Sequence, residues 1–176
     1  DLIYVLAATD DGPAVFAVTR DADGLMPTTL RTVDPTRKQC TVSLADTPAR
    51  LVGEPGCGTT AVAAALEAAG VALVSEQAGG AHRAVRMAAA YAGTRFQFAR
   101  AIGSFQAVKH MCADMLAEAE SAVSAARHVA AAYDAAVPDR AADLALAQAF
   151  CSDAFVFVAA TNIQVHGGIG FTWEHP

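Results

Sequence analysis

The sequence predicts an α+β protein in which a partial antiparallel β domain precedes an α-helical bundle. Compact β-type runs separated by polar turns fill residues 1–52. Four glycines or prolines fall within residues 53–58, where neither a strand nor a helix continues easily. The alanine-rich remainder, residues 59–176, places apolar residues at helical spacing. We therefore expect the C-terminal part of a β domain at 1–52, a linker at 53–58 and a helical domain at 59–176, incomplete at both chain ends.

The β region is expected to form a meander of short strands. The runs Leu2–Ala8 and Ala14–Thr19 flank a cluster of turn residues and predict a hairpin. Residues 21–27 are expected to form a loop. The further expected strands are Leu30–Val33, Gln39–Leu44 and Arg50–Val52. Such a sheet would have bare edges unless further strands preceded it.

Three long helices are expected after the linker. They are predicted at about Thr59 to Thr94, Ser104 to Asp134, and from the break Val137-Pro138-Asp139 to about Val165. The segment Phe150–Ala160 is apolar nearly all round, so we expect a further helix or a partner subunit to cover it. Gly70, Gly79 and Gly80 weaken a helix, and their expected use is to let another helix or a ligand approach closely.

Composition excludes several classes of function. The formal net charge of −6 argues against a nucleic-acid partner. The chain has no run of eighteen apolar residues and no visible signal peptide, so no membrane span and a cytoplasmic location are expected. The four cysteines lie far apart and the five histidines lack ligand spacing, so no metal site is expected. A charged fraction of only 17% predicts surface buried in an oligomer.

The stretch Tyr91 to Gln106, YAGTRFQFARAIGSFQ, carries the densest set of candidate ligand-binding residues. It lies between two predicted helices and combines arginine, glutamine and phenylalanine side chains. Arginine offers a planar fork of donors that matches phosphate, and aromatic rings offer flat apolar surface. The composition of this stretch alone leaves two readings open, a site for a flat anionic cofactor and a solvated helix–helix corner.

This stretch resembles the helix-turn-helix signature of the acyl-CoA dehydrogenase family, R-x-x-F-G-[KR]-x-I-x-x-[FH]-Q. A second signature of that family, Q-x-x-G-G-x-G-[FY], matches Gln164–Phe171, QVHGGIGF, in the expected order. The run Gly79–Met115 most resembles the actinobacterial branch, in which several members are heterotetrameric and act on steroid-CoA side chains. The resemblance implies the C-terminal helical domain of the family, preceded by part of its middle β domain.

The resemblance also implies an activity, a cofactor and partners. Members use FAD to dehydrogenate an acyl-CoA thioester across its α and β carbons, pass electrons to electron-transfer flavoprotein, and assemble as homo- or hetero-tetramers. Arg95 matches the arginine that meets the FAD diphosphate of the neighbouring subunit. The other positions implied to bind the cofactor are Gln97, Phe98, Gln106, Gln164, Gly167 and Gly168.

Two neighbouring positions depart from the family pattern. Ala99 stands where glycine is usual, and Ala101 where proline or leucine is common. If position 99 requires φ > 0, its alanine is strained, because a Cβ disfavours the left-handed region. Retention of FAD is therefore an open question for this chain.

No catalytic base is identified. Proton abstraction needs a carboxylate at the substrate α carbon, and the position that serves an isovaleryl-type minority of the family falls on Ala69. The nearby Glu67 and Glu76 are expected to make surface or interhelical polar contacts. Two explanations stay open. The base lies in a segment beyond the C-terminal residue, or this chain is a non-catalytic companion subunit of a heteromeric acyl-CoA dehydrogenase.

Overall fold

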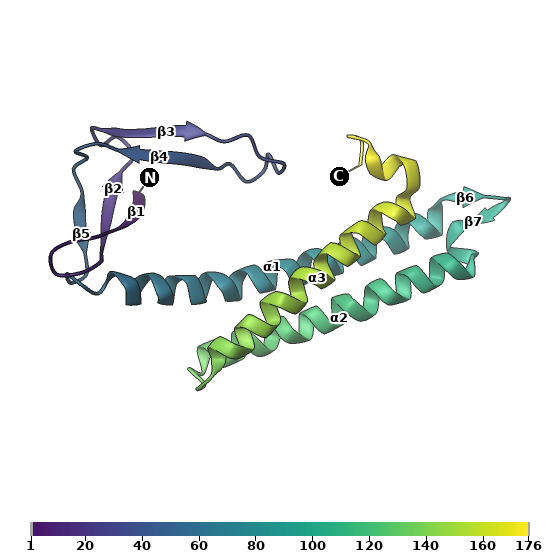
Figure 1. Cartoon of the computed structure of the whole chain (residues 1–176). Helices are drawn as coiled ribbons and strands as arrows, with labels where there is room; N and C mark the ends of the chain where they lie inside the picture. The colour runs from purple at the N-terminus through teal and green to yellow at the C-terminus, as the bar shows by residue number, and fades with distance from the viewer. Residues whose placement is uncertain (1, 176) are drawn as a thin grey trace. The chain divides into compact units, whose positions relative to one another are not determined.

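The computed structural model describes residues 2–175 and divides into two compact units, Asp1–Leu66 and Glu67–Pro176. The first unit holds β-sheets and the second is helical (Figure 1). The division falls within the first long helix, α1 (Gly58–Thr94). The predicted α+β class, with a β region followed by a helical bundle, is confirmed.

The first unit contains a three-stranded antiparallel sheet in the order β1-β2-β5. β1 (Leu2–Ala7) and β2 (Ala14–Thr19) form the predicted hairpin. β5 (Arg50–Val52) pairs with the other edge of β2. The central strand β2 is therefore the buried one, with Ala14 fully buried and Val18 only 2% exposed.

A separate two-stranded sheet corrects the expected meander. It pairs β3 (Leu25–Thr29) with β4 (Cys40–Leu44), so residues 25–27 are strand rather than loop. The strand expected at residues 30–33 is absent from the structure. Pro27, which faces Val42, favoured the loop prediction. Proline is tolerated here because both strands of a two-stranded sheet are edges, where a ladder N–H can be missing.

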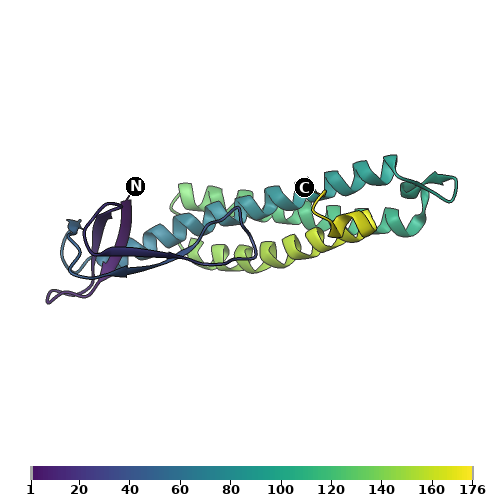
Figure 2. The ribbon, with the colours of Figure 1, turned by 90° about the horizontal axis from the view of Figure 1, so that it is seen from above.

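The helical unit consists of three long helices that lie side by side (Figures 1 and 2). They are α1, α2 (Gln106–Asp134) and α3 (Arg140–His166), and each agrees with its predicted span to within two residues. A short 3-10 turn, η1 (Ile102–Ser104), precedes α2, and another, η2 (Gly167–Phe171), follows α3. The helices pack through small side chains such as Ala81, Ala119 and Ala122, all fully buried.

Glycines in α1 permit this close packing at two of the three expected positions. A Cβ at Gly80 would come within 2.8 Å of the Phe155 ring, and one at Gly70 within 2.7 Å of the Gln148 amide nitrogen. At Gly79 an added Cβ meets nothing within 4 Å, so no helix within residues 2–175 approaches closely there, and the approach of a ligand stays a prediction.

Part of the apolar surface of α3 stays exposed. Leu146 is 72% exposed and Val156 is 68% exposed. Within the described residues, α1 and the segment Arg140–Phe171 are long and apolar enough to cross a membrane by length and composition. Alanine-rich helices that pack in a bundle meet the same criterion. The absence of a membrane span therefore stays a prediction.

Candidate functional site

The turn after α1 is a small β-hairpin that projects from one end of the bundle (Figure 1). Its strands are β6 (Phe96–Gln97) and β7 (Arg100–Ala101), paired antiparallel. Arg95 stands between α1 and β6. Its N–H donates to the carbonyl of Tyr91 at 2.8 Å, and its carbonyl accepts from the N–H of Ile102 at 2.8 Å. The backbone of the candidate phosphate-binding arginine is therefore fixed from both sides.

The hairpin turns through two residues with positive φ. Phe98 has φ 54° and Ala99 has φ 62°. Positive φ at both central residues is the requirement of a type I′ turn, which favours Asn-Gly. The condition for strain at Ala99 is thus met, at a cost of roughly 1–2 kcal/mol per non-glycine residue. Ala101 is extended, with φ −60° and ψ 137°, so this second departure adds no strain of that kind.

An aromatic cluster supports the base of the hairpin. The guanidinium carbon of Arg100 lies 3.9 Å from the centre of the Phe105 ring, close enough for a cation–π contact. Phe98 meets the same ring edge-on, with 6.2 Å between centroids, and is itself 89% exposed. Arg100 is therefore held against the chain's own aromatic ring.

The second signature forms the end of α3 and the turn η2. Gly167 caps the helix with φ 63° and ψ −138°, and its N–H donates to the carbonyls of Gln164 and Ile163. An added Cβ would meet nothing within 4 Å at Gly167 or at Gly168. The space beside both glycines is therefore open.

One pocket of about 420 Å³, which we call the Arg95 pocket, brings the two signatures together. Arg95 and Gln97 line it from the hairpin side, and Gly167 and Gly168 line it from the end of α3. The resemblance implied a shared cofactor role for these four residues, and the fold places them around one space. Ile102, Val165 and Ile169 add apolar walls.

Three other predicted residues do not line this pocket. The side-chain nitrogen of Gln106 lies 2.8 Å from Nε2 of His110 on the next turn of α2. Phe98 packs on Phe105 outside the pocket, and Gln164 is exposed on α3. Their implied cofactor contacts stay predictions.

Two lining residues lay outside the predicted set. Tyr91 and His166 both line the Arg95 pocket, and their rings stack with centroids 4.3 Å apart. Nδ1 of the buried His166 donates to the carbonyl of Asn162 at 2.8 Å. The position of Tyr91, one helical turn before Arg95, was a signal that could have identified it.

The carboxylate nearest the Ala69 position is already engaged. Nε and a terminal nitrogen of Arg140 donate to the two oxygens of Glu67, which joins α1 to α3. Hydrogen bonds from Arg140 hold the pKa of Glu67 below its ordinary value of 4.5. A carboxylate held ionised in this way is a weak base, and the expected interhelical contact is confirmed. Among the described residues, no three or more His, Cys, Asp or Glu side chains come together in a way that could hold a metal ion.

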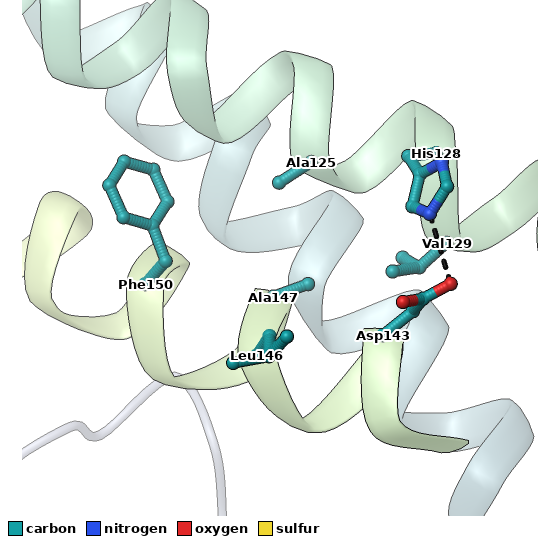
Figure 3. Close-up of a pocket in the computed structure, with 7 residues that line it drawn as sticks. All are labelled: Ala125, His128, Val129, Asp143, Leu146, Ala147 and Phe150. Carbon is teal, nitrogen blue, oxygen red and sulfur yellow. Dashed lines mark hydrogen bonds and ion pairs between the residues drawn. The ribbon is translucent and has the colours of Figure 1, made fainter. Parts of the chain in front are cut away.

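A separate hollow of about 230 Å³ lies between α2 and α3 (Figure 3). Leu146 and Phe150 line it, and Nε2 of His128 lies 3.0 Å from Oδ2 of Asp143 at one side. It contains none of the residues of either signature. Because it lies between α2 and α3 and shares no residue with the Arg95 pocket, we assign it no part in cofactor binding.

Comparisons with known proteins agree with this architecture. Residues 56–176 match the family model "Acyl-CoA dehydrogenase, C-terminal domain". The acyl-CoA dehydrogenase IpdE2 of Mycobacterium tuberculosis is 41% identical over 145 residues, which cover 82% of this chain and 41% of the relative.

Two solved structures extend the comparison. The Tcur3481-Tcur3483 steroid ACAD G363A variant has a TM-score of 0.85 at 30% identity, covering 99% of this chain and 46% of that chain. A structure of the electron transferring flavoprotein of Acidaminococcus fermentans has a TM-score of 0.93 at 26% identity, covering 100% and 47%. This chain thus spans less than half the length of each of these relatives. The family-model match and the two signatures show that the chain belongs to the acyl-CoA dehydrogenase family, with its C-terminal domain at residues 56–176.

Proposed function

We propose that this chain contributes the C-terminal part of an FAD-dependent acyl-CoA dehydrogenase subunit, which catalyses α,β-dehydrogenation of an acyl-CoA thioester. The observation that carries the proposal is the Arg95 pocket, where Arg95 and Gln97 face the Gly167–Gly168 turn. These segments are about seventy residues apart in the sequence, and the packing of α1 against α3 brings them together around an open space.

The residues of the pocket fit a diphosphate. The side chain of Arg95 has no ion-pair or hydrogen-bond partner within residues 2–175, so its donors are available. A guanidinium binds phosphate oxygens through two parallel hydrogen bonds. Gly167 and Gly168 present no side chain, so a phosphate can approach their backbone closely.

Each residue has a distinct task in this proposal. The two backbone hydrogen bonds of Arg95 hold its main chain at the pocket, its guanidinium would bind the FAD diphosphate, and Gln97 adds a neutral amide at the same wall. The stacked rings of Tyr91 and His166 form an apolar wall that shields these hydrogen bonds from water. When bound, FAD supplies hydride acceptance. A pocket of about 420 Å³ encloses only part of a dinucleotide, so we place the rest of FAD on a neighbouring subunit.

The relatives guide the finer proposals. The steroid ACAD supports a steroid side-chain CoA ester as the substrate class. We propose a homo- or hetero-tetramer with acyl-CoA dehydrogenase-like chains, and the paired chain names of the steroid ACAD support the heteromeric form. The structure named for electron transferring flavoprotein supports that protein as the electron acceptor. A cytoplasmic location stays a prediction.

The second candidate function is a non-catalytic companion subunit of a heteromeric acyl-CoA dehydrogenase. It is favoured by the absence of a carboxylate at Ala69 and by the engagement of Glu67 with Arg140. In this role the chain completes the cofactor site of its partner, and the partner supplies the catalytic base.

The test is flavin retention by the chain purified with whatever subunits copurify. Arg95→Ala is expected to weaken FAD binding at least tenfold, about the effect of losing a charge-assisted phosphate contact of roughly 1.5–3 kcal/mol. Arg127→Ala is the matched control, because Arg127 is exposed on α2 and does not line the Arg95 pocket. Equal retention by both variants would contradict the cofactor role. A colourless parent protein that still binds a homologous chain would instead favour a scaffold with no productive flavin site.

A further inference from the structure

A second pocket of about 410 Å³ adjoins the Arg95 pocket, and its two arginines belong to neither signature. We call it the α1 arginine pocket. Arg83 and Arg86 line it from α1, and Glu174 and His175 line it from the segment after η2. The two pockets share Tyr91, His166 and Ile169 as lining residues.

Both arginines are free to bind an anion. They lie three residues apart on α1, which places them one turn apart on the same side of the helix. Both are exposed, and neither has an ion pair or hydrogen bond with any residue from 2 to 175. The chain has 18 acidic residues against 12 basic ones, so unpaired neighbouring arginines are not a result of scarce carboxylates.

The described lining of the α1 arginine pocket has more basic than acidic side chains. Among the described residues Glu174 is the only carboxylate that lines the pocket, against two guanidinium groups. The neighbouring Thr172 side chain is the main cause that lowers the pKa of the Glu174 carboxyl. With Glu174 ionised, two guanidinium groups against one carboxylate leave the described lining with one net positive charge.

A third polar group at the pocket lacks a partner. His175 meets the His166 ring edge-on, with 4.3 Å between centroids, and His166 in turn stacks on Tyr91. Nε2 of His175 is buried and has no hydrogen-bond partner among the described residues. A buried nitrogen without a hydrogen-bond partner lowers the stability of the folded state. A bound ligand that hydrogen-bonds to this nitrogen would remove that cost.

We propose that the α1 arginine pocket binds a phosphate group and is a second anion site beside the Arg95 pocket. The arginine forks match phosphate oxygens, and the ring stack of Tyr91, His166 and His175 gives the site a rigid wall. A concave site with a buried nitrogen suits a compact oxyanion better than an extended acidic peptide. Because the two pockets share three residues, the phosphate belongs either to a separate ligand or to a second group of the nucleotide held at Arg95.

The test is titration of the whole chain with inorganic phosphate, followed by calorimetry or 31P NMR at low salt. Arg83→Gln and Arg86→Gln are each expected to weaken phosphate binding about tenfold, the effect of one lost charge-assisted contact. Arg127→Gln removes the same charge from α2 outside both pockets and is expected to change the affinity less than twofold. An equal loss in all three variants, or no binding by the parent chain, would overturn the proposal.

Two further arms identify the source of the phosphate. Phosphate binding that persists at saturating FAD supports a separate phosphorylated ligand, and displacement by FAD supports a second contact to the same nucleotide. Binding of hexaglutamate without any binding of phosphate would overturn the proposal in favour of a protein-docking surface. The proposal does not depend on the cofactor role of Arg95, because Arg95→Ala tests one pocket and Arg83→Gln tests the other.

Discussion

The two halves of α1 differ in whether the arginines near them have a partner. In the first half, Glu67 is paired with Arg140 of α3, and His128 and Asp143 pair nearby between α2 and α3. In the second half, Arg83 and Arg86 have no partner within residues 2–175, and neither has Arg95, which directly follows α1. His82 of the same half lies 3.6 Å from Glu120 of α2. The arginine beside the first half of α1 thus connects two helices, whereas the three arginines at its second half line pockets and are available to a ligand.

Backbone strain does not distinguish the two ends. Non-glycine residues with positive φ occur at Phe98 and Ala99 in the hairpin, and at Ala136 and Asp139 in the turn between α2 and α3. Strain alone is therefore not a marker of function in this fold. The difference lies in unpaired arginines beside an open pocket, and the following substitutions test it from the largest expected effect to the smallest.

Gly167→Ala is expected to have the largest effect, at the open end. Its φ of 63° and ψ of −138° lie in a region that a Cβ disfavours. We expect a loss of about 1–2 kcal/mol in the free energy of unfolding. Gly168→Ala is the matched control, because an added Cβ meets nothing within 4 Å at either position and only Gly167 has positive φ. Equal losses in chemical denaturation would show that backbone conformation is not what Gly167 provides.

Ala99→Gly is expected to have a smaller effect in the opposite direction. Glycine removes the left-handed penalty at φ 62°, and part of that gain is offset by its greater freedom in the unfolded chain. We expect a net stabilisation of about 0.5–1 kcal/mol by urea unfolding. Ala101→Gly is the control. Ala101 has a φ of −60°, so glycine removes no penalty there and should lower the stability of the fold. A loss of stability in Ala99→Gly would show that the hairpin does not use positive φ at this position.

Glu67→Gln is expected to have the smallest effect and tests the paired end. The pKa of Glu67 is lowered in the folded state, so its ion pair contributes stability above about pH 4.5, its ordinary pKa, and loses that contribution as pH falls through the lowered value. The Tm difference between the parent and Glu67→Gln should therefore be positive at pH 7 and shrink below pH 4.5. Asp153→Asn, on the exposed side of α3, should show no such convergence. A difference that is constant with pH would contradict the pairing.

The helices could be predicted from the sequence because local signals agree there. Alanine favours helix, and the breaks at Gly53–Gly58, Val137–Asp139 and Gly167–Gly168 mark the boundaries. β3 could not be predicted from the sequence. Pro27 locally favours a loop, and only its pairing with Val42 in a separate sheet makes this segment a strand. The pairing of β2 with β5 is likewise a long-range choice without a local signal.

The site was predictable in part. Two family signatures identified Arg95 and Gly167, but only the fold places them around one pocket. The hairpin was not predicted, because Phe98 and Ala99 are unfavourable residues for the turn that they form. Arg83 and Arg86 carry no signature, and their spacing equally fits a solvated helix face. Their importance emerges only from the lack of partners in three dimensions.

Trp173 gives this end of the molecule a natural optical reporter. It is the single tryptophan of the chain, it is fully exposed, and it immediately precedes Glu174 and His175 of the α1 arginine pocket. The intrinsic fluorescence of the chain therefore describes one local environment rather than an average over the fold. A subunit or ligand that covers this segment should shift the emission to shorter wavelength, without a label and without disturbing the bundle.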